Sequence, residues 1–410
     1  MTERRQRVPD VFDEARRRCH AGETVALATV VATWHSAPQP PGATMLVAAD
    51  GTVTGSVSGG CVEADLYERA RRVLVTGAPE LIRYGVSDDD AYAVGLTCGG
   101  ALDVFVERVD PDALPGLDAV AAARRAARPA AVVTCVAADA GGSPADVGAA
   151  PADVGDPPGL GDAPGALSTD PAGRLGRRLV LTDQRVIGSL GDDRLDDAAS
   201  ADALGLLAAG RSGMLRYGYS GQRRGSGVSL FVTAYATPPR MIVFGAIDFA
   251  AAVARIGAFL GYRVTVCDAR PVFTTARRFP DADEVVVQWP HRYLRAEADA
   301  GRVDERTAVC VLTHDPRFDV PLLEVALRHP LAYVGAMGSR RTHDDRLKLL
   351  GEAGLTEAQL ARLASPIGLD LGGRTPEETA VSVAAQIVAA RWGGTGRPLA
   401  ALDGPIHRPG

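Results

Sequence analysis

Several features are scarce in this sequence, and each shortage excludes a class of protein. The 410 residues include six cysteines, none of them in CxxC spacing. We therefore expect neither a disulfide framework nor a zinc ribbon, but a reducing, cytoplasmic setting. Lys and Arg total 44 against 50 Asp and Glu, which argues against nucleic acid as the main partner. No apolar run reaches the roughly 18 residues that a membrane span needs, and the charged N-terminal segment precedes no apolar stretch, which predicts no secretory signal.

Aromatic residues are also few, at 5%, but 46% of the chain is hydrophobic and 23% is charged, as in ordinary globular proteins. The length predicts two or three domains. Apolar segments and glycine-rich turns predict an α/β protein with two parts. The first is an α/β domain over residues 11–235, and the second is a Rossmann-like domain with a parallel sheet over residues 240–392.

The first domain contains an internal repeat. Residues 128–235 repeat residues 11–109, and the best-matched window has a constant offset of 133 positions. This pattern indicates a duplication, in which shared turn glycines and apolar residues serve the scaffold. The matched pairs are Val53/Val186, Gly55/Gly188, Ser56/Ser189, Ala70/Ala203, Leu74/Leu207, Gly77/Gly210, Arg83/Arg216, Tyr84/Tyr217 and Gly85/Gly218. A segment rich in Ala, Asp, Gly and Pro, 137–176, interrupts the second half, and its lack of large apolar residues predicts a disordered loop.

Residues present in one half only are candidates for chemistry, because the scaffold does not require them. The first half has a glycine-rich turn where the second half has Arg194 and its neighbours, and it has a thiol, Cys98, in another turn. We expect Cys61 to superpose on Arg194. The predicted catalytic residues are Cys61, Cys98 and Glu63, and the predicted cofactor-binding residues of this turn are Ser58, Gly59 and Gly60.

Two interpretations of Cys61 remain open. A cysteine in a turn can be a small buried hydrophobe. Alternatively, the helix that follows favours the thiolate form, which can ligate a soft metal, carry a persulfide or attack an electrophile. Glu63 would lie in the first turn of the same helix, where its charge also suits the helix dipole without any further role.

The second domain carries an altered dinucleotide-binding turn. Gly245 follows an apolar strand and precedes a helix, and Asp268 ends the next strand, as in a Rossmann fingerprint. However, Ile247 occupies the position of the second glycine, and Asp248 places a carboxylate at the helix N-terminus. There Asp248 can cap the helix, but it would repel a phosphate. We therefore expect a Rossmann-type fold in which Gly245 and Asp268 are candidate cofactor-binding residues and NAD(P) is not the ordinary ligand.

Two other strand ends carry polar residues at the edge where α/β sheets bind ligands. One has His314 and Asp315, and the other has a glycine-rich turn that resembles a phosphate cradle. A hydrogen-bonded loop histidine and a tight turn with solvated arginines are the alternatives. The candidate cofactor-binding residues here are His314, Asp315, Gly338, Ser339, Arg340 and Arg341, and no metal-ligand cluster is predicted.

Together these motifs resemble the XdhC/CoxI family, accessory proteins of xanthine dehydrogenase and related molybdenum hydroxylases. The likeness is carried by SAPQPPGATM, GSVSGGCVEADL, GLTCGG, VFGAIDFA, VLTHDPRFD, YVGAMGSRRTH and PIGLDLGGRTPEETAVS. It implies a cytoplasmic chaperone, not a stand-alone enzyme, that binds molybdenum cofactor, as molybdopterin or its cytosine dinucleotide form, and assists its sulfuration and insertion. The implied partner is a molybdenum hydroxylase apoenzyme, with a cysteine desulfurase and a second copy of the chain as further candidates.

The alternative function is an NAD(P)-linked oxidoreductase that acts through the Rossmann-like domain. The chain also departs from the family pattern, which commonly has GAGH where this sequence has Gly245 to Asp248, and Arg and Lys near Gln39 and Thr44. These changes remove a close-approach glycine and two positive charges. Arg340 and Arg341 are candidates to compensate for them.

Overall fold

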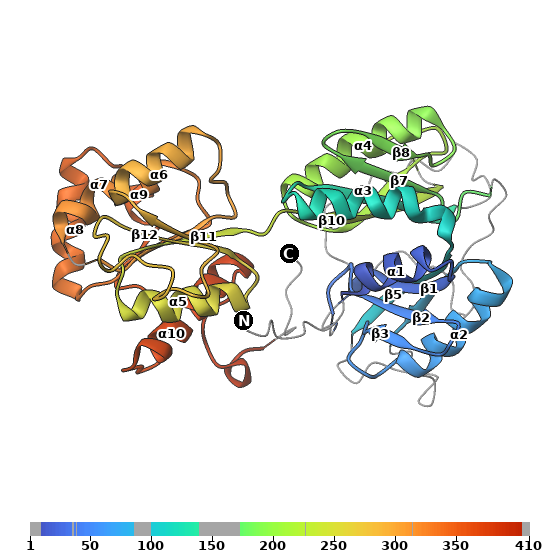
Figure 1. The fold of residues 1–410 in the computed structure, drawn as a ribbon, viewed down its shortest axis with the longest axis horizontal. Coiled ribbons are helices and arrows are strands. Elements are labelled where there is room, and N and C mark those ends of the chain that lie inside the picture. Colours follow the sequence, from blue (N-terminus) through green and yellow to red (C-terminus); the bar gives the residue numbers. More distant parts are fainter. Residues whose placement is uncertain are drawn as a thin grey trace. The chain divides into compact units, whose positions relative to one another are not determined.

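The computed structural model describes residues 10–34, 37, 39–85, 100–138, 173–225, 227–313 and 315–403. The chain divides into two compact units between Thr237 and Pro238, and each unit is a layered α/β structure (Figure 1). Within these ranges, none of the helices combines the length and apolar character that crossing a bilayer requires.

The first half of the first unit is an antiparallel sheet backed by one helix. Its strands lie in the order β3-β2-β1-β5-β4. Alternate residues of β1, among them Ala26, Ala28 and Val30, pack with Leu66 and Ala70 of α2 in one core. The elements are α1 (Val11–His20), β1 (Val25–Trp34), β2 (Thr44–Ala48), β3 (Val53–Gly55), α2 (Glu63–Thr76), β4 (Glu80–Tyr84) and β5 (Ala101–Val109).

The second half has the same arrangement. Its strand order, β8-β7-β6-β10-β9, matches that of the first sheet position by position. Each half also has a hairpin that ends at a paired glycine, since Met45 pairs with Gly55 and Leu179 pairs with Gly188, although the second hairpin is one residue shorter. The elements are η1 (Pro111–Ala113), α3 (Leu114–Arg125), β6 (Ala130–Ala138), β7 (Arg178–Thr182), β8 (Val186–Gly188), α4 (Asp193–Ala208), β9 (Gly213–Tyr217) and β10 (Val228–Tyr235). A common origin of the halves remains a prediction that this topology supports.

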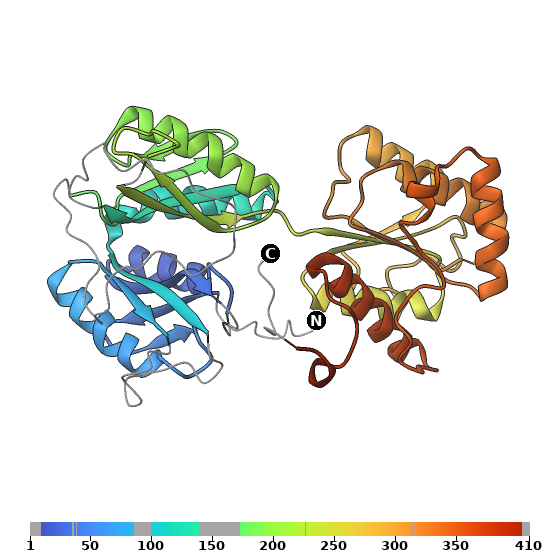
Figure 2. The ribbon, with the colours of Figure 1, turned by 180° about the vertical axis from the view of Figure 1, so that it is seen from behind.

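The two halves face each other within the first unit. Helices α2 and α4 lie on the outer faces, and α1 and α3 lie side by side between the sheets (Figures 1 and 2). Beyond these helices the sheets touch directly, where Val31 and Phe105 of the first pack against Val136 and Phe231 of the second.

The halves differ where the candidate chemistry lies. Helix α4 begins at Asp193 and is capped by Asp192, whose side chain accepts from the backbone N–H of Leu195. At the offset of 133, α2 begins three residues later, because the first half uses those residues for a turn. Arg194 is therefore helical, whereas Cys61 precedes its helix, and their superposition stays a prediction. Residues 139–172 of the predicted loop lie outside the described residues, and Ala137 and Ala138 belong to strand β6.

The second unit is a parallel sheet with the strand order β13-β12-β11-β14-β15-β16. This is the order of a Rossmann fold, so the predicted α/β class and Rossmann-like part are confirmed. One face packs on α5 and α10, and the other packs on α6, α7 and α8 (Figures 1 and 2). The elements are β11 (Arg240–Phe244), α5 (Asp248–Phe259), β12 (Arg263–Asp268), β13 (Glu284–Val287), α6 (Pro290–Asp299), β14 (Ala308–Val311), α7 (Pro316–Arg328), β15 (Tyr333–Ala336), α8 (Arg340–Glu352), α9 (Glu357–Leu360), β16 (Leu363–Ala364), α10 (Pro376–Trp392) and η2 (Leu399–Ala401).

Candidate functional site

The glycine-rich turn before α2 is folded around the carboxylate of Glu63. Seven hydrogen bonds reach this carboxylate. Gly59 and Gly60 take positive φ values of 78° and 122°, a region that favours glycine, and thereby aim their N–H groups inward. The donors are the hydroxyls of Ser56 and Ser58 and the backbone N–H groups of Val57, Ser58, Gly59, Gly60 and Val62.

This environment fixes Glu63 as an anion. Burial raises the pKa of its carboxyl, but the hydrogen bonds from Ser56, Ser58 and the backbone outweigh burial and lower the pKa to about 2. The second half keeps a reduced version of the contact, since Asp196 accepts from the N–H of Leu190 at 2.7 Å. A carboxylate with saturated acceptors is a poor proton carrier, so the geometry favours a positioning role for Glu63 over the predicted catalytic one.

Cys61 lies at the end of this turn, two residues before α2 begins. Its backbone N–H donates to the hydroxyl of Ser58 at 3.0 Å, and its side chain is partly buried against the core below α2. Cys61 is therefore positioned by the turn and is only partly buried. The other predicted thiol, Cys98, lies outside the described residues, so a pairing of Cys61 with Cys98 stays a prediction.

The remaining cysteines of the described chain are packing residues, as their positions in helix and strand patterns predict. Cys19, Cys135, Cys267 and Cys310 are each buried. Burial raises the pKa of Cys267 and of Cys310 to about 12, so both remain thiols at neutral pH.

The altered turn of the second unit is closely packed at Gly245. This residue has φ of 114°, and an added Cβ would lie 3.1 Å from the carbonyl carbon of Leu312 and 3.2 Å from a methyl of Thr313. Strands β11 and β14 are neighbours here, so Gly245 sits at the point where the strand order reverses. The absence of a side chain at Gly245 allows the ends of these two strands to lie this close together.

Asp268 is buried at the end of β12. Both oxygens of its carboxylate accept hydrogen bonds from groups of the protein itself. One oxygen accepts from the backbone N–H of Ala246 at 2.7 Å and from Arg270 Nη2 at 2.7 Å. The other oxygen accepts from the backbone N–H and Nε of Arg270 at 2.9 and 3.0 Å. A carboxylate has about four lone-pair positions, so none remains for the ribose hydroxyl that a Rossmann acid ordinarily binds.

The start of α5 differs from the expectation that Asp248 caps the helix. Ile247 is the N-cap residue and makes no side-chain cap, whereas Asp248 is the first helical residue. Its side chain points outward to Arg278, with Asp248 Oδ1 3.1 Å from Arg278 Nη2. A small cavity of about 210 Å³ adjoins this turn, and Arg270 and Phe273 help to line it. Arg270 and Arg278, which both line this cavity, are thus each already paired with a carboxylate.

The other two strand ends place their predicted residues at helix starts. Asp315 caps α7 and pairs with Arg317, while His314 lies outside the described residues. Ser339 caps α8 by accepting from the N–H of Thr342 at 3.1 Å. After Gly338 and Ser339, the exposed Arg340 and Arg341 open this helix, and within the described ranges neither arginine forms an ion pair.

The turn before α8 rests on a buried ion pair. Arg346 Nη2 lies 2.8 Å from Asp319 Oδ2, and each side chain is only 3% exposed. Arg346 also donates to the carbonyl of Met337 at 3.1 Å, and Asp319 accepts from the hydroxyl of Thr313. One pair therefore ties the loops after β14 and β15 together and holds the α8 start in place.

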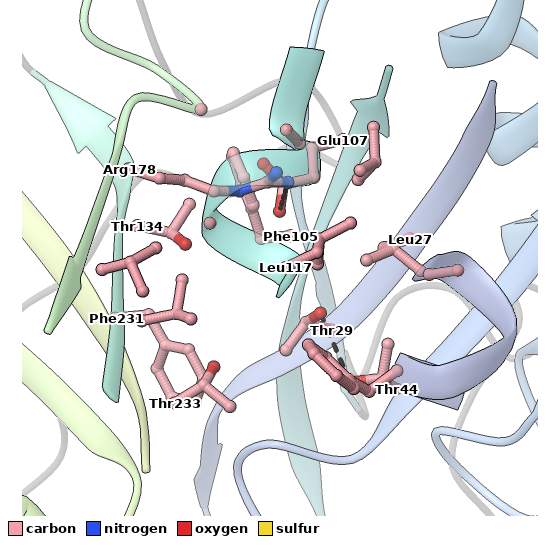
Figure 3. A pocket seen from close by; sticks show the side chains of 18 of the residues that line it. Leu27, Thr29, Thr44, Phe105, Glu107, Leu117, Thr134, Arg178, Phe231 and Thr233 are labelled. Carbon is pink, nitrogen blue, oxygen red and sulfur yellow. Dashed lines mark hydrogen bonds and ion pairs between the residues drawn. The ribbon is translucent and has the colours of Figure 1, made fainter. Parts of the chain in front are cut away.

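Sequence reasoning missed a cavity in the first unit. It has a volume of about 540 Å³ and lies between the inner faces of the two sheets, beside α1 and α3 (Figure 3). Its walls are mainly aliphatic and aromatic, with threonines on both sheets and one ion pair, Arg178–Glu107, that spans them. The alternation Leu27-Thr29-Val31 and Val132-Thr134-Val136 is the signal that could have revealed two apolar faces with a threonine at their centre.

Two models of protein families match the chain. Residues 241–387 match the model of the XdhC Rossmann domain. Residues 19–85 and 168–218 match the model of the XdhC and CoxI family. Together the two matches cover more than half of the chain.

Two relatives and one solved structure are similar to this chain over most of its length. A Bacillus subtilis (strain 168) protein, named as a probable xanthine dehydrogenase subunit, is 25% identical over 90% of this chain and 94% of its own. The molybdenum cofactor insertion chaperone PaoD of Escherichia coli (strain K12) is 24% identical over 90% of this chain and 85% of its own. A Bacillus halodurans crystal structure described as a xanthine dehydrogenase is 22% identical, has a TM-score of 0.62 and covers 95% of this chain and 97% of its own, which shows a shared fold.

Proposed function

Since this chain belongs to the XdhC and CoxI family, we propose that it is an accessory factor that binds molybdenum cofactor and helps to load it into a molybdenum hydroxylase of the xanthine dehydrogenase or CO dehydrogenase type. The relative named as a molybdenum cofactor insertion chaperone aligns over 90% of the chain and supports this role. In this proposal the protein works in the cytoplasm, the apoenzyme is its partner, and a cysteine desulfurase supplies the sulfur for sulfuration.

The saturated carboxylate of Asp268 is the observation that favours this function over an NAD(P)-linked oxidoreductase. An NAD-dependent dehydrogenase of the Rossmann type needs a free acid for the ribose, and NAD and NADP sites alike ordinarily have a glycine where the pyrophosphate approaches. Here Arg270 and the backbone N–H of Ala246 donate hydrogen bonds to the Asp268 carboxylate. Ile247 stands where the glycine would be. The unit keeps the fold but lacks two features on which ordinary dinucleotide binding depends.

The residues present are compatible with an anionic cofactor that carries a soft metal–sulfur centre. Arg340 and Arg341 provide exposed positive charge at the N-terminus of α8, where anions are favoured. Cys61 provides a sulfur ligand, which suits a soft centre better than oxygen does. In the proposal Arg340 and Arg341 offer a position for an anionic group on the second unit, and Cys61 of the first unit serves cofactor binding or sulfuration; Ser58, Gly59 and Gly60 act by holding the Cys61 turn.

Retention of the cofactor tests this proposal. The protein is purified from cells that make molybdenum cofactor, and molybdenum and pterin are measured per protomer after desalting. We expect both to be retained, and we expect the loaded protein to restore activity to a molybdenum hydroxylase apoenzyme. Micromolar affinity for NAD(H) or NADP(H), with turnover of a substrate and no retained pterin, would favour the oxidoreductase instead.

A further inference from the structure

The cavity between the two sheets of the first unit has nearly symmetric walls. Thr29 of β1 pairs with Phe105 of β5, and Thr134 of β6 pairs with Phe231 of β10. Each sheet therefore contributes a phenylalanine with a threonine beside it, and aliphatic side chains surround both pairs (Figure 3). A volume of about 540 Å³ falls in the range of small-molecule sites, whereas ordinary protein interiors are packed without voids of this size.

One position breaks this symmetry and gives the cavity its polar end. Thr44 pairs with Thr29 in the first sheet, but Arg178 pairs with Thr134 in the second. The Arg178 side chain crosses to the other sheet, where its Nη2 lies 2.7 Å from Glu107 Oε1 (Figure 3). Both side chains are largely buried, at 21% and 10% exposed.

This charge pair retains hydrogen-bonding capacity. Across the residues that the structure describes, no hydrogen bond to other side chains engages the remaining guanidinium N–H groups of Arg178 or the second carboxylate oxygen of Glu107. The same holds for the hydroxyl of Thr134. Arg178, Glu107 and Thr134 all line the cavity, so a ligand that offers an acceptor to Arg178 and a donor to Glu107 can use the hydrogen-bonding capacity that the pair leaves open.

The charge balance selects against anions. Arg178 is the one cationic side chain among the residues that line the cavity, and Glu107 neutralises it at contact distance. Asp10 is likewise neutralised by its ion pair with Arg124, and Asp112 adds negative charge to the lining. A phosphate or carboxylate would enter a surface without net positive charge and would leave water for apolar walls, which is unfavourable. The cavity therefore differs in chemistry from the exposed arginines at the start of α8.

From these contacts we propose that the cavity binds a neutral, flat heterocyclic lactam, such as an oxopurine or an oxopteridine base. The ring lies against the apolar walls with Phe105 and Phe231, its carbonyl accepts from Arg178, and its adjacent N–H donates to Glu107. This ligand is separate from the anionic cofactor, and the proposal does not depend on how that cofactor is held.

Binding of matched probes to the full-length protein by calorimetry tests this site. The neutral lactams are hypoxanthine and 6-methylpterin, the anion is purine-6-carboxylate, and the ring without an acceptor is indole. We expect the lactams to bind at least tenfold more tightly than indole or the carboxylate, since one hydrogen bond to a charged group is worth about tenfold or more in affinity. The ratio of the two lactam affinities identifies which ring the cavity takes.

Three variants locate the binding. Glu107→Gln leaves Arg178 without a counter-charge, so the lactam should lose about tenfold in affinity while purine-6-carboxylate gains. Thr134→Phe fills the cavity and should abolish binding of every probe. Val186→Phe is the control, because Val186 belongs to the same sheet but is exposed and lies outside the cavity. A thermal melt of each variant shows which ones are folded.

The outcomes are decisive in both directions. If folded Thr134→Phe binds hypoxanthine as the unaltered protein does, or if purine-6-carboxylate is preferred before Glu107 is changed, the proposal is wrong. It is also wrong if neither lactam binds. Loss of lactam binding in Thr134→Phe with retained molybdenum and pterin would support the site and would separate it from the proposed cofactor role.

Discussion

The hydroxyl of Ser58 donates a 2.5 Å hydrogen bond to Glu63 and accepts the backbone N–H of Cys61 at 3.0 Å. Glu63 is thus linked to Cys61 through a single side chain that is itself buried. The same carboxylate receives the N–H groups of Gly59 and Gly60. The turn that presents the thiol is therefore organised by an internal anion, and its backbone donors point to that anion instead of to a ligand.

Replacement of this anion should loosen the turn. In Glu63→Gln one acceptor oxygen becomes a donor that faces other donors, so we expect a loss of about 2 kcal/mol in the stability of the first unit. Asp196→Asn is the matched control in the other half, where the carboxylate holds the N–H of Leu190, and about 1 kcal/mol is expected there. Hydrogen exchange of the backbone amides of residues 57–62 measures how far the turn loosens. Equal protection of these amides in both variants and in the unaltered protein would contradict the prediction.

The same contact predicts a dependence on pH. Because the pKa of Glu63 is lowered from 4.5 to about 2 in the folded protein, its contribution is fully present above pH 4.5. It is lost as the pH falls toward 2, when the carboxylate takes up a proton. After solvent screening we expect about 2 kcal/mol from this group. The difference in melting temperature between the unaltered protein and Glu63→Gln should shrink between pH 6 and pH 3; a constant difference would count against the account.

Dinucleotide binding should require two changes in the second unit. Ile247→Gly restores the close-approach glycine, but Asp268 stays occupied by Arg270, so we expect no affinity for NAD(H) in the single variant. Ile247→Gly combined with Arg270→Ala releases acceptors on Asp268 and should produce measurable binding. Titration followed by nicotinamide fluorescence tests both variants, with Arg255→Ala, a change at an exposed ion pair, as the control. Tight binding by the unaltered protein would refute the role given to Asp268.

The buried pair Arg346–Asp319 should dominate the stability of the second unit. Arg346→Leu leaves a carboxylate buried without its counter-charge, and we expect a loss of about 3 kcal/mol or more. Asp248→Ala breaks the pair with Arg278, in which the aspartate is 86% exposed, and should cost less than about 1 kcal/mol. Thermal melts of both variants compare the two costs; similar melting temperatures would show that the buried pair is not the tie between the loops after β14 and β15.

The sequence predicts the scaffold well where local patterns determine it. The hairpin around Asp50-Gly51 forms, with Gly51 at φ of 84°, because an Asp-Gly pair between apolar segments specifies this turn. The capping box of Thr375 and Glu378 starts α10, because a Thr followed three residues later by a Glu specifies a helix start. Both features depend on residues that are neighbours in the chain.

Contacts between distant residues were not predictable in the same way. The cavity of the first unit joins Glu107 to Arg178, which are far apart in sequence and meet because the two sheets face each other. The position of Asp248 allows it to cap α5, but its side chain turns outward to Arg278 instead. The acid Asp268 was found from its position after the strand, whereas its saturation by Arg270 depends on side-chain geometry that spacing does not determine.

The central claim is that Cys61 serves cofactor binding, and one measurement tests it most directly. Molybdenum and pterin are counted per folded protomer after desalting in Cys61→Ser, with Cys310→Ser, at a buried cysteine, as the control. We predict that Cys61→Ser keeps its fold and loses the cofactor, because a hydroxyl is a harder and less acidic ligand than a thiol. Cys310→Ser is predicted to lose stability through a buried hydroxyl but to retain cofactor in the folded fraction. Full retention of molybdenum and pterin by folded Cys61→Ser would contradict the account.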